Sequence, residues 1–463
     1  MHLDPVLLSR LQFAWLIAWH ILLPAFTVGL ASYIALLEAI VFFTGRDIYA
    51  RISAFWTKIF SVAFGMGVVS GIMMPFQFGT NWSRFSDATA NVISPLLAYE
   101  GLTAFFLEAA FLGVLLFGRK LVPPWAHFLA GVMVAGGTLL STFWIIATNS
   151  WMQTPAGYEI VDGRFFPVDW LQVIFNPSFP YRLAHTVVAF YVTTGFVVVG
   201  IGAWLVRQGR FVGEGRIMVS MTLWLLTALT PLQIALGDAH GLNTLEHQPA
   251  KLAAIEARWE TARGAPLTLF AWPDAANETN RYAVEIPYLG SLILAHDLNG
   301  EIKGLKDWPA DQRPPVAIPF FAFRIMVGVG LAMLAIVALS VLLRWRDALF
   351  DHDWFLRLCQ IAAPFGFVAV IAGWTTTEVG RQPWSVYGLL RTADSTSPSL
   401  TGLDVLLSLG AYMIVYLVIF PAGGLVMARI VSAGPGDKTE ADAPIESGRP
   451  DHPIQVNIDG QQA

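Results

Sequence analysis

Cysteine is nearly absent from this chain of 463 residues, whose one cysteine is Cys359. A single thiol excludes an internal disulfide, an iron–sulfur cluster held by cysteines and a cysteine-rich zinc site. Charge is scarce as well, at 13% of residues against about 25% in soluble domains. Hydrophobic residues make up 55% of the chain, so the composition predicts a polytopic membrane protein.

Long apolar runs separate the few charged residues, and a helix needs about 20 apolar residues to cross a bilayer. We therefore predict an all-α membrane protein with about nine transmembrane helices. The short segment before the first run carries Asp4 and does not resemble a cleavable signal peptide. The predicted spans lie at about 12–43, 54–78, 95–118, 125–148, 183–206, 217–236, 318–343, 357–378 and 401–430.

These runs divide the chain into four parts. Residues 1–236 hold the first six spans, and residues 318–430 hold the last three. The polar segment 237–317 between them is too long for a simple turn and is predicted to form a small extramembrane domain. Residues 431–463 are rich in Gly, Pro and Asp, which predicts a disordered tail.

Lysine and arginine are distributed unequally between the two sets of short loops. Short cytoplasmic loops carry an excess of these residues, so the richer set is predicted to be cytoplasmic. The N-terminus and the 237–317 segment would then be on the outer side of the membrane, and the C-terminus cytoplasmic. The richer set comprises Arg46, Arg51, Arg119, Lys120, Arg207, Arg210, Arg216, Arg344, Arg346, Arg357 and Arg429.

Ionisable residues within the predicted spans are few, and such residues are costly in lipid and functional by default. The predicted topology places five potential donors near the outer ends of their spans, which indicates one layered site. Arg324 precedes one of these donors, and Glu108 lies deeper. The five donors are His20, Glu100, His185, Met326 and Glu378.

Haem iron accounts for this mixture of donors. A histidine and a methionine give a six-coordinate haem that transfers electrons. A guanidinium such as that of Arg324 or Arg381 suits haem propionates. Each residue alone has a simpler explanation: a histidine bonded to a neighbouring helix, a methionine that fills space, or a Glu378–Arg381 ion pair. Glu100 and Glu108 are two turns apart on one helix and indicate either a polar path or a structural network.

Eight motifs carry a family resemblance over about Ser9 to Arg429. The chain resembles subunit I of the cytochrome bd-type quinol oxidases, including the branch called cyanide-insensitive oxidases. The motifs are LSRLQFA…H at Leu8–His20, EGLTAFFLE at Glu100–Glu108, NSWMQTPAG at Asn149–Gly157, RLAHT around His185, GD..G at Gly237–Gly241, KLAAIEARWET at Lys251–Thr261, FRIMVG at Phe323–Gly328 and GW.TTEVGRQPW at Gly373–Trp384.

The resemblance implies a set of haem sites. His185 and Met326 match the axial ligands of a low-spin haem b, with Arg324 beside it. His20 and Glu378 match ligands of two high-spin haems, a second haem b and a haem d or a further haem b in its place. The remaining matches are Glu100 as a further carboxylate at that site, Glu108 and Ser141 on the proton path, and Trp374 between the haems.

Lys251 and Glu256 match the quinol-oxidation residues of the family's extramembrane "Q-loop". On a helix, five residues correspond to about 140° of rotation, so the two could address different sides of a quinol headgroup. Glu256 would accept a quinol proton, and Lys251 would hold or polarise an oxygen. The short distance from Lys251 to the seventh span resembles the short-loop members of the family. Without the resemblance, a solvated amphipathic helix explains the same pattern.

The resemblance also implies activity, partners and location. The expected activity is oxidation of quinol at the periplasmic side and reduction of O2 to water with cytoplasmic protons, which generates proton motive force without pumping. Subunit II is the expected partner, joined in some members by a small single-span subunit. We expect a multi-pass protein of the bacterial inner membrane with no nucleic-acid partner. An electron-relaying cytochrome and a haem-free proton-coupled transporter are the alternative functions.

Overall fold

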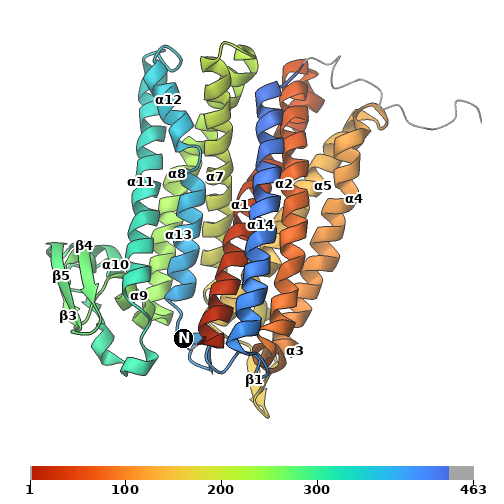
Figure 1. Ribbon diagram of the computed structural model, residues 1–463. Helices are drawn as coiled ribbons and strands as arrows, with labels where there is room; N and C mark the ends of the chain where they lie inside the picture. The colour runs from red at the N-terminus through yellow and green to blue at the C-terminus, as the bar shows by residue number, and fades with distance from the viewer. Residues whose placement is uncertain (1–2, 437–463) are drawn as a thin grey trace, which may run out of the picture.

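The computed structural model describes residues 3–436 and contains, within that range, nine helices long and apolar enough to cross a membrane. They stand side by side as a bundle (Figure 1). The predicted all-α fold and the predicted number of spans are confirmed. The spans are α1 (Pro5–Thr44), α2 (Asp47–Thr80), Ser83–Lys120, α5 (Pro124–Gln153), α7 (Phe179–Arg207), α8 (Val212–His247), α11 (Ala317–Trp345), Asp353–Val379 and α14 (Gly402–Ala433).

The predicted tail lies outside the described residues from 437 onward. Capping residues in the sequence define several helix ends. Asp4 accepts a hydrogen bond from the backbone N–H of Val6 at the start of α1, and Gly45 ends that helix in the left-handed region. Thr401 and Asp404 form a capping box at the start of α14.

Two of the nine spans are interrupted. The third consists of α3 (Ser83–Tyr99), a π-helical turn η1 (Glu100–Phe105), α4 (Phe106–Phe117) and a 3₁₀ turn η2 (Gly118–Lys120). The eighth consists of α12 (Asp353–Ala362) and α13 (Phe365–Val379). A π-helical turn inserts an extra residue into a helix and is frequent at functional sites. Here it begins at the predicted site residue Glu100.

The segment between α8 and α11 folds outside the bundle and contains a β-hairpin (Figure 1). The antiparallel strands of the hairpin are β4 (Leu267–Asp274) and β5 (Thr279–Ile286). We call the end of the bundle beside this hairpin the hairpin end; the N-terminus of α1 lies there too (Figure 1). The other elements of the segment are α9 (Pro249–Ile255), α10 (Leu289–Ala295), the pair β3 (Ala262–Arg263) and β6 (Glu301–Ile302), and the 3₁₀ turns η3 (Leu305–Asp307) and η4 (Ala310–Gln312).

The sixth spanning helix, α8, continues to His247, eleven residues beyond the expected end of the span at 236. At 1.5 Å per residue its 36 residues measure about 54 Å, which exceeds the hydrocarbon core of a bilayer. The first part of segment 237–317 is therefore a continuation of α8, and α9 follows directly after it.

Smaller elements connect the spans at the hairpin end. A strand pair, β1 (Tyr158–Val161) and β2 (Arg164–Pro167), and the short helix α6 (Trp170–Ile174) link α5 to α7. A second pair, β7 (Trp384–Val386) and β8 (Leu390–Arg391), links α13 to α14.

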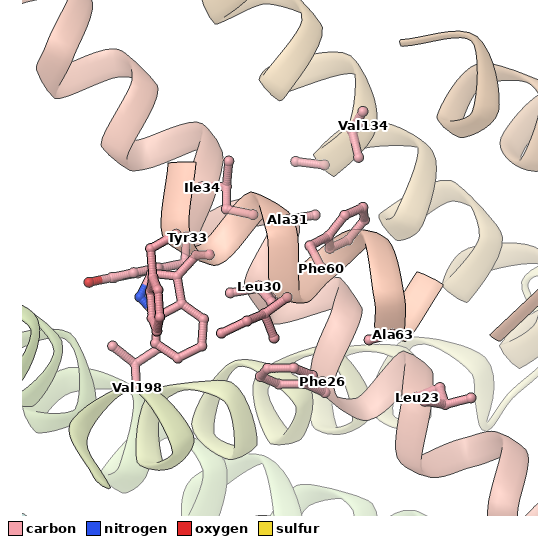
Figure 2. Close-up of a cluster of buried hydrophobic side chains, with 14 of the residues drawn as sticks. Leu23, Phe26, Leu30, Ala31, Tyr33, Ile34, Phe60, Ala63, Val134 and Val198 are labelled. Carbon is pink, nitrogen blue, oxygen red and sulfur yellow. The ribbon is translucent and has the colours of Figure 1, made fainter. Parts of the chain in front are cut away.

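Helix α1 forms the centre of the bundle and packs against α2, α5, α7, α13 and α14. Its Leu30 is fully buried, together with Phe60 of α2, Val134 of α5 and Val198 of α7. Figure 2 shows these side chains converging from four helices. Since all four are fully buried, this cluster fixes the positions of the helices that carry the polar residues described next.

Candidate functional site

Glu378 and Arg381 form an ion pair at the hairpin end of α13. Their charged atoms are 2.5 Å apart, and both side chains are largely buried, with 17% and 9% of their surface exposed. Glu378 also accepts hydrogen bonds from the amides of Asn149, at 3.0 Å, and Gln153, at 3.4 Å. A buried carboxylate with several donors is held in one orientation.

Two further cations join this carboxylate through α5. Arg182 of α7 donates to the side-chain amide oxygen, Oδ1, of Asn149. Lys251 of α9 donates from Nζ to the amide oxygens of Gln153, at 2.5 Å, and Gln248, at 2.7 Å. Gln153 thus bridges the predicted quinol residue Lys251 and the predicted iron ligand Glu378. Burial, reinforced by the charge of Arg182, lowers the pKa of Lys251 well below its ordinary value.

Glu256 lies just past the end of α9 and contacts a different cation. Its carboxylate is 3.1 Å from the guanidinium of Arg324 and is almost fully buried. Burial raises the pKa of Glu256, and the charge of Arg324 only partly offsets that rise. Lys251 and Glu256 therefore have separate partners, as expected for residues on different sides of a helix.

Arg324 also donates to the backbone carbonyls of Ile255, Thr268 and Phe320, so each of its three nitrogens has an acceptor. The guanidinium lies 3.5 Å from the centre of the Phe320 ring. In this arrangement Arg324 ties α11 to the loop segment and directs no free nitrogen toward a propionate.

His185 of α7 faces α8. A Cβ atom added at Gly237 would lie 3.2 Å from Cε1 of His185. The amide nitrogen of Gln233 is within 3.3 Å of both ring nitrogens, and the ring of His240 is centred 5.8 Å away. The side chain of Gln233 thus lies beside the ring nitrogens of His185, and its own buried Oε1 has no partner.

Met326 and His20 each face a glycine as well. A Cβ atom at Gly373 of α13 would lie 2.8 Å from Sδ of Met326, and one at Gly71 of α2 would lie 3.2 Å from Cε1 of His20. Nδ1 of His20 is 2.9 Å from Oγ of Ser70, which also bonds to its own helix backbone. Ser70 thus fixes the ring and leaves the other nitrogen for a ligand.

Replacing Ser70 by alanine is expected to free the His20 ring. His20 is predicted to hold haem iron, so the absorbance of that haem should broaden or shift, and the turnover of the protein should fall about tenfold or more, because loss of an outer partner of a metal ligand typically costs that much. The reduced-minus-oxidised spectrum of the purified protein measures the first effect and oxygen uptake the second. Ser61→Ala on the same helix, whose hydroxyl bonds only to the carbonyl of Lys58, is the control. An unchanged spectrum in Ser70→Ala would remove the positioning role.

The two carboxylates of the third span contact α5. Ser141 donates to Oε1 of Glu100 at 2.7 Å. Glu108 is buried, and a Cβ atom at Gly137 would lie 2.6 Å from its Cγ. In the part of the chain that the structure describes, no hydrogen bond or ion pair joins Glu100 or His20 directly to Glu378.

His20 and Glu100 also lie deeper than the sequence indicated. α1 begins at Pro5 and α3 at Ser83, so His20 is about four turns and Glu100 nearly five turns from its helix start. The less apolar first turns of both helices were not counted in the predicted spans. The donors therefore occupy two depths, with His185, Met326 and Glu378 nearer the hairpin end.

These residues fit haem. In residues 3–436 no three or more His, Cys, Asp or Glu side chains come together as a metal site; the donors stand singly on separate helices. Glycines beside His20, His185 and Met326 give close approach to each donor. The guanidinium groups of Arg182 and Arg381 keep buried nitrogens without partners, which the carboxylates of a propionate-bearing ring would satisfy. Trp374 is half-buried on α13 beside Gly373.

Sequence reasoning missed the amide residues of this site. Asn149 and Gln153 are four apart on α5 and thus share one face of that helix. Both are in the NSWMQTPAG motif, yet a search for charged residues within spans passes over uncharged amides. Arg182 lies in the RLAHT motif around His185, but sequence reasoning assigned it no role in the site. The spacing of polar residues along α5 is the signal that could have found the two amides.

A multi-pass membrane protein with buried haem-type donors and an acid–base pair at one end is a membrane-embedded redox protein. The sequence model for cytochrome bd terminal oxidase subunit I matches residues 8–435. The chain belongs to this family, and is accordingly the subunit of a quinol oxidase that pairs with another subunit and carries haem.

Three similar proteins extend over almost the whole chain. Cytochrome bd ubiquinol oxidase subunit 1 of Bacillus subtilis is 33% identical and aligns over 96% of this chain and 97% of its own. Cytochrome bd-II ubiquinol oxidase subunit 1 of Escherichia coli is 31% identical, over 93% and 97%. The structure of the bd oxidase from Geobacillus thermodenitrificans superposes with a TM-score of 0.87 at 31% identity, over 94% of this chain and 99% of that one.

Proposed function

We propose that this subunit oxidises quinol at the periplasmic side and reduces O2 to water with cytoplasmic protons, without pumping. Quinol gives up two electrons and two protons, and O2 takes four electrons and four protons to become two water molecules. The observation that carries the proposal is the buried network at the hairpin end, where Gln153 contacts both Lys251 and Glu378.

Lys251 and Glu256 bind and deprotonate the quinol. Both are buried, at 4% and 2% exposure, although both belong to the extramembrane segment. A protonated Lys251 donates to one quinol oxygen, and an ionised Glu256 accepts the proton of the other. Arg324 orients the Glu256 carboxylate and stabilises its charge.

His185 and Met326 hold a low-spin haem b, and His20 and Glu378, with Glu100, hold two high-spin haems, of types b and d or both b. Bound haem supplies iron that carries electrons and binds oxygen. The buried, unpartnered nitrogens of Arg381 and Arg182 would bind the propionates. Arg324 belongs to the quinol side of this arrangement, and Trp374 would lie between the haem sites. Ser141 and Glu108 lie on the path that brings protons to Glu100.

The membrane orientation follows from the positions of the cations. Among the short loops, those opposite the hairpin end carry more lysine and arginine residues, so the end opposite the hairpin faces the cytoplasm of a bacterial inner membrane. The hairpin end and the N-terminus are then periplasmic, and the C-terminus is cytoplasmic. Protons from quinol are released at the hairpin end, and protons for O2 are taken up at the opposite end. The reaction therefore separates charge although no proton crosses the whole membrane.

The partner is subunit II of the oxidase, and a small single-span subunit is its natural companion. The lipid- and partner-facing surface includes α14, which exposes a long apolar face with Leu407, Ile414, Val418 and Leu425. An exposed apolar face of this kind suits contact with lipid or with subunit II.

The test is a reduced-minus-oxidised spectrum of the purified oxidase with and without carbon monoxide, together with quinol-dependent oxygen uptake. We expect a Soret band, a carbon-monoxide-sensitive fraction and oxygen consumption. In inside-out and right-side-out vesicles, proton release should appear on the hairpin side. A colourless protein, or a haem protein that binds no carbon monoxide and consumes no oxygen, would refute the proposal.

A further inference from the structure

A second buried polar cluster lies at the end of the bundle opposite the hairpin. Glu38 of α1 has only 3% of its side-chain surface exposed and accepts hydrogen bonds from Ser53 of α2 and Arg119 of η2. Its other oxygen is 2.9 Å from Nδ1 of His127 of α5. Four elements thus converge on one carboxylate, and none of these residues belongs to the site described above.

The hydrogen bonds of His127 determine where protons lie. Its Nε2 is 3.1 Å from the backbone carbonyl oxygen of Leu115, which can only accept, so Nε2 carries a hydrogen. Nδ1 faces a carboxylate oxygen, which also accepts. A proton must therefore lie between Nδ1 and Glu38 Oε2, and the pair shares one exchangeable proton beyond neutral imidazole and carboxylate.

This shared proton is close to the aqueous phase at the opposite end. The side chain of Arg119 is 36% exposed and reaches Glu38 from the surface. Replacing a buried ion pair by apolar residues is often neutral or stabilising, so stability alone is a weak explanation for the pair.

Helix α5 connects this cluster to the carboxylates of the proposed proton path. Besides His127, a Cβ atom at Gly131 would lie 3.6 Å from Cγ of Glu38. Further along, Gly137 faces Glu108 and Ser141 bonds to Glu100. These four α5 positions share one side of the helix, within about 120° of rotation.

The carboxylates therefore follow one another along α5 in the order Glu38, Glu108, Glu100. The only long gap is between Gly131 and Gly137, and six residues of α-helix rise about 9 Å. A chain of about two or three water molecules would be needed to cover such a distance. The absence of side chains at both glycines leaves the carboxylates close to the helix surface.

We propose that the Glu38–His127 pair is the proton-uptake station of this oxidase. The pair passes its shared proton, through water along α5, to the carboxylate of Glu108. The pair is then reprotonated from the aqueous phase beside Arg119, so one proton moves inward for each cycle of the station. This inference rests on the proposed function, because it supplies the protons consumed with oxygen.

The decisive variant is Glu38→Gln in the complete oxidase. The amide keeps the size of the side chain but cannot accept and release the shared proton. Quinol-dependent oxygen uptake should fall about 100-fold, within the range for losing a general acid–base group, and its solvent deuterium isotope effect should rise. Haem content and the rate of haem reduction by quinol without oxygen should stay at wild-type values, because electron input lies at the hairpin end.

Glu214→Gln is the matched control. Glu214 forms a 2.7 Å ion pair with Arg51 at the same end of the bundle but does not contact α5. This variant should keep wild-type turnover. If Glu38→Gln fails to assemble, His127→Gln removes the same shared proton and still offers an N–H to the Leu115 carbonyl.

The outcomes distinguish failure of the proton-uptake station from failure of the proposed oxidase function. Normal turnover and an unchanged isotope effect in the assembled variant would overturn the uptake station, as would a loss of thermal stability with normal turnover per haem. Failure of the proposed function looks different: the wild-type protein itself would not consume oxygen with quinol. A variant with impaired haem reduction in the absence of oxygen would also count against the station.

Discussion

Replacing Met326 by leucine should abolish the low-spin haem signal while leaving the protein folded. Leucine and methionine differ little in volume, and such exchanges in packed interiors cost less than about 1.5 kcal/mol. Sulfur, however, is the atom that would bind iron opposite His185. Without it the haem would lose one of its two protein ligands and the thioether's contribution to a high potential.

Oxygen uptake with quinol should fall about 100-fold in Met326→Leu, since removing even an outer partner of a metal ligand costs 10- to 100-fold. The reduced-minus-oxidised spectrum should lose its sharp low-spin bands. His185→Ala should lose the same bands, and the high-spin absorbance should persist in both variants. These three observations identify the haem that each residue serves.

Met333→Leu is the control for this prediction. Met333 is on the same helix, seven residues further, and is buried in an apolar cluster with 5% exposure. Its replacement removes a sulfur atom two helical turns away from the proposed ligand position. Intact low-spin bands in Met326→Leu, with normal quinol oxidation, would show that another residue holds the sixth position.

The spans of the bundle could be predicted because each one is specified by its own stretch of sequence. A run of apolar residues as long as the bilayer is thick specifies a span whatever its neighbours are, and the nine runs match nine helices. The depth of His20 and Glu100 was less predictable. The helices that carry them, α1 and α3, begin about two and about three turns before their apolar runs, and hydropathy does not register those turns.

The site was predictable only where charge marked it. Glu378 and Arg381 stood out as charges at the end of an apolar run and do form a pair. Asn149 and Gln153 could not be recognised in the same way, because an uncharged amide shows no functional signal in the sequence. Their role appears only in the folded chain, where a carboxylate or an ammonium group contacts them. The Arg324–Glu256 pair was equally hidden, since 68 residues separate its members and only the folded loop segment joins them.

Glu38 and His127 illustrate the same limit more sharply. Glu38 lies near the end of the first apolar run and His127 at the start of the fourth, where charged residues commonly mark the membrane surface. Only the packing of α1 against α5 reveals that the two share a buried hydrogen bond. Long-range pairs of this kind carry no periodic signal along the chain.

Replacing Glu256 by glutamine should stop quinol oxidation while leaving haem in place. Loss of a general base typically costs 10²- to 10⁴-fold, so oxygen uptake should fall at least about 100-fold. The amide preserves the contact with Arg324 but cannot take a proton. Haem spectra and reduction by dithionite should match the wild type, because the changed residue lies in the extramembrane segment.

The pH profile of the wild-type protein gives an independent measure of the same pair. Burial raises the pKa of Glu256, so the base form is lost as pH falls through a value above that of an ordinary glutamate. Burial lowers the pKa of Lys251 well below its usual range, so the protonated donor is lost as pH rises, earlier than for an exposed lysine. Quinol oxidation should therefore follow a bell-shaped curve with an acid limb from Glu256 and an alkaline limb from Lys251.

Lys251→Arg separates the two limbs. A guanidinium keeps its proton throughout this range, so the alkaline limb should move to higher pH or disappear while the acid limb stays. Arginine cannot reproduce the hydrogen bonds of Lys251 to Gln153 and Gln248, so maximal turnover should fall as well. The test therefore depends on the pH at which the alkaline limb falls and not on the maximal rate. An alkaline limb unmoved in Lys251→Arg would assign that titration to another group and would leave Lys251 without a role in proton transfer from quinol.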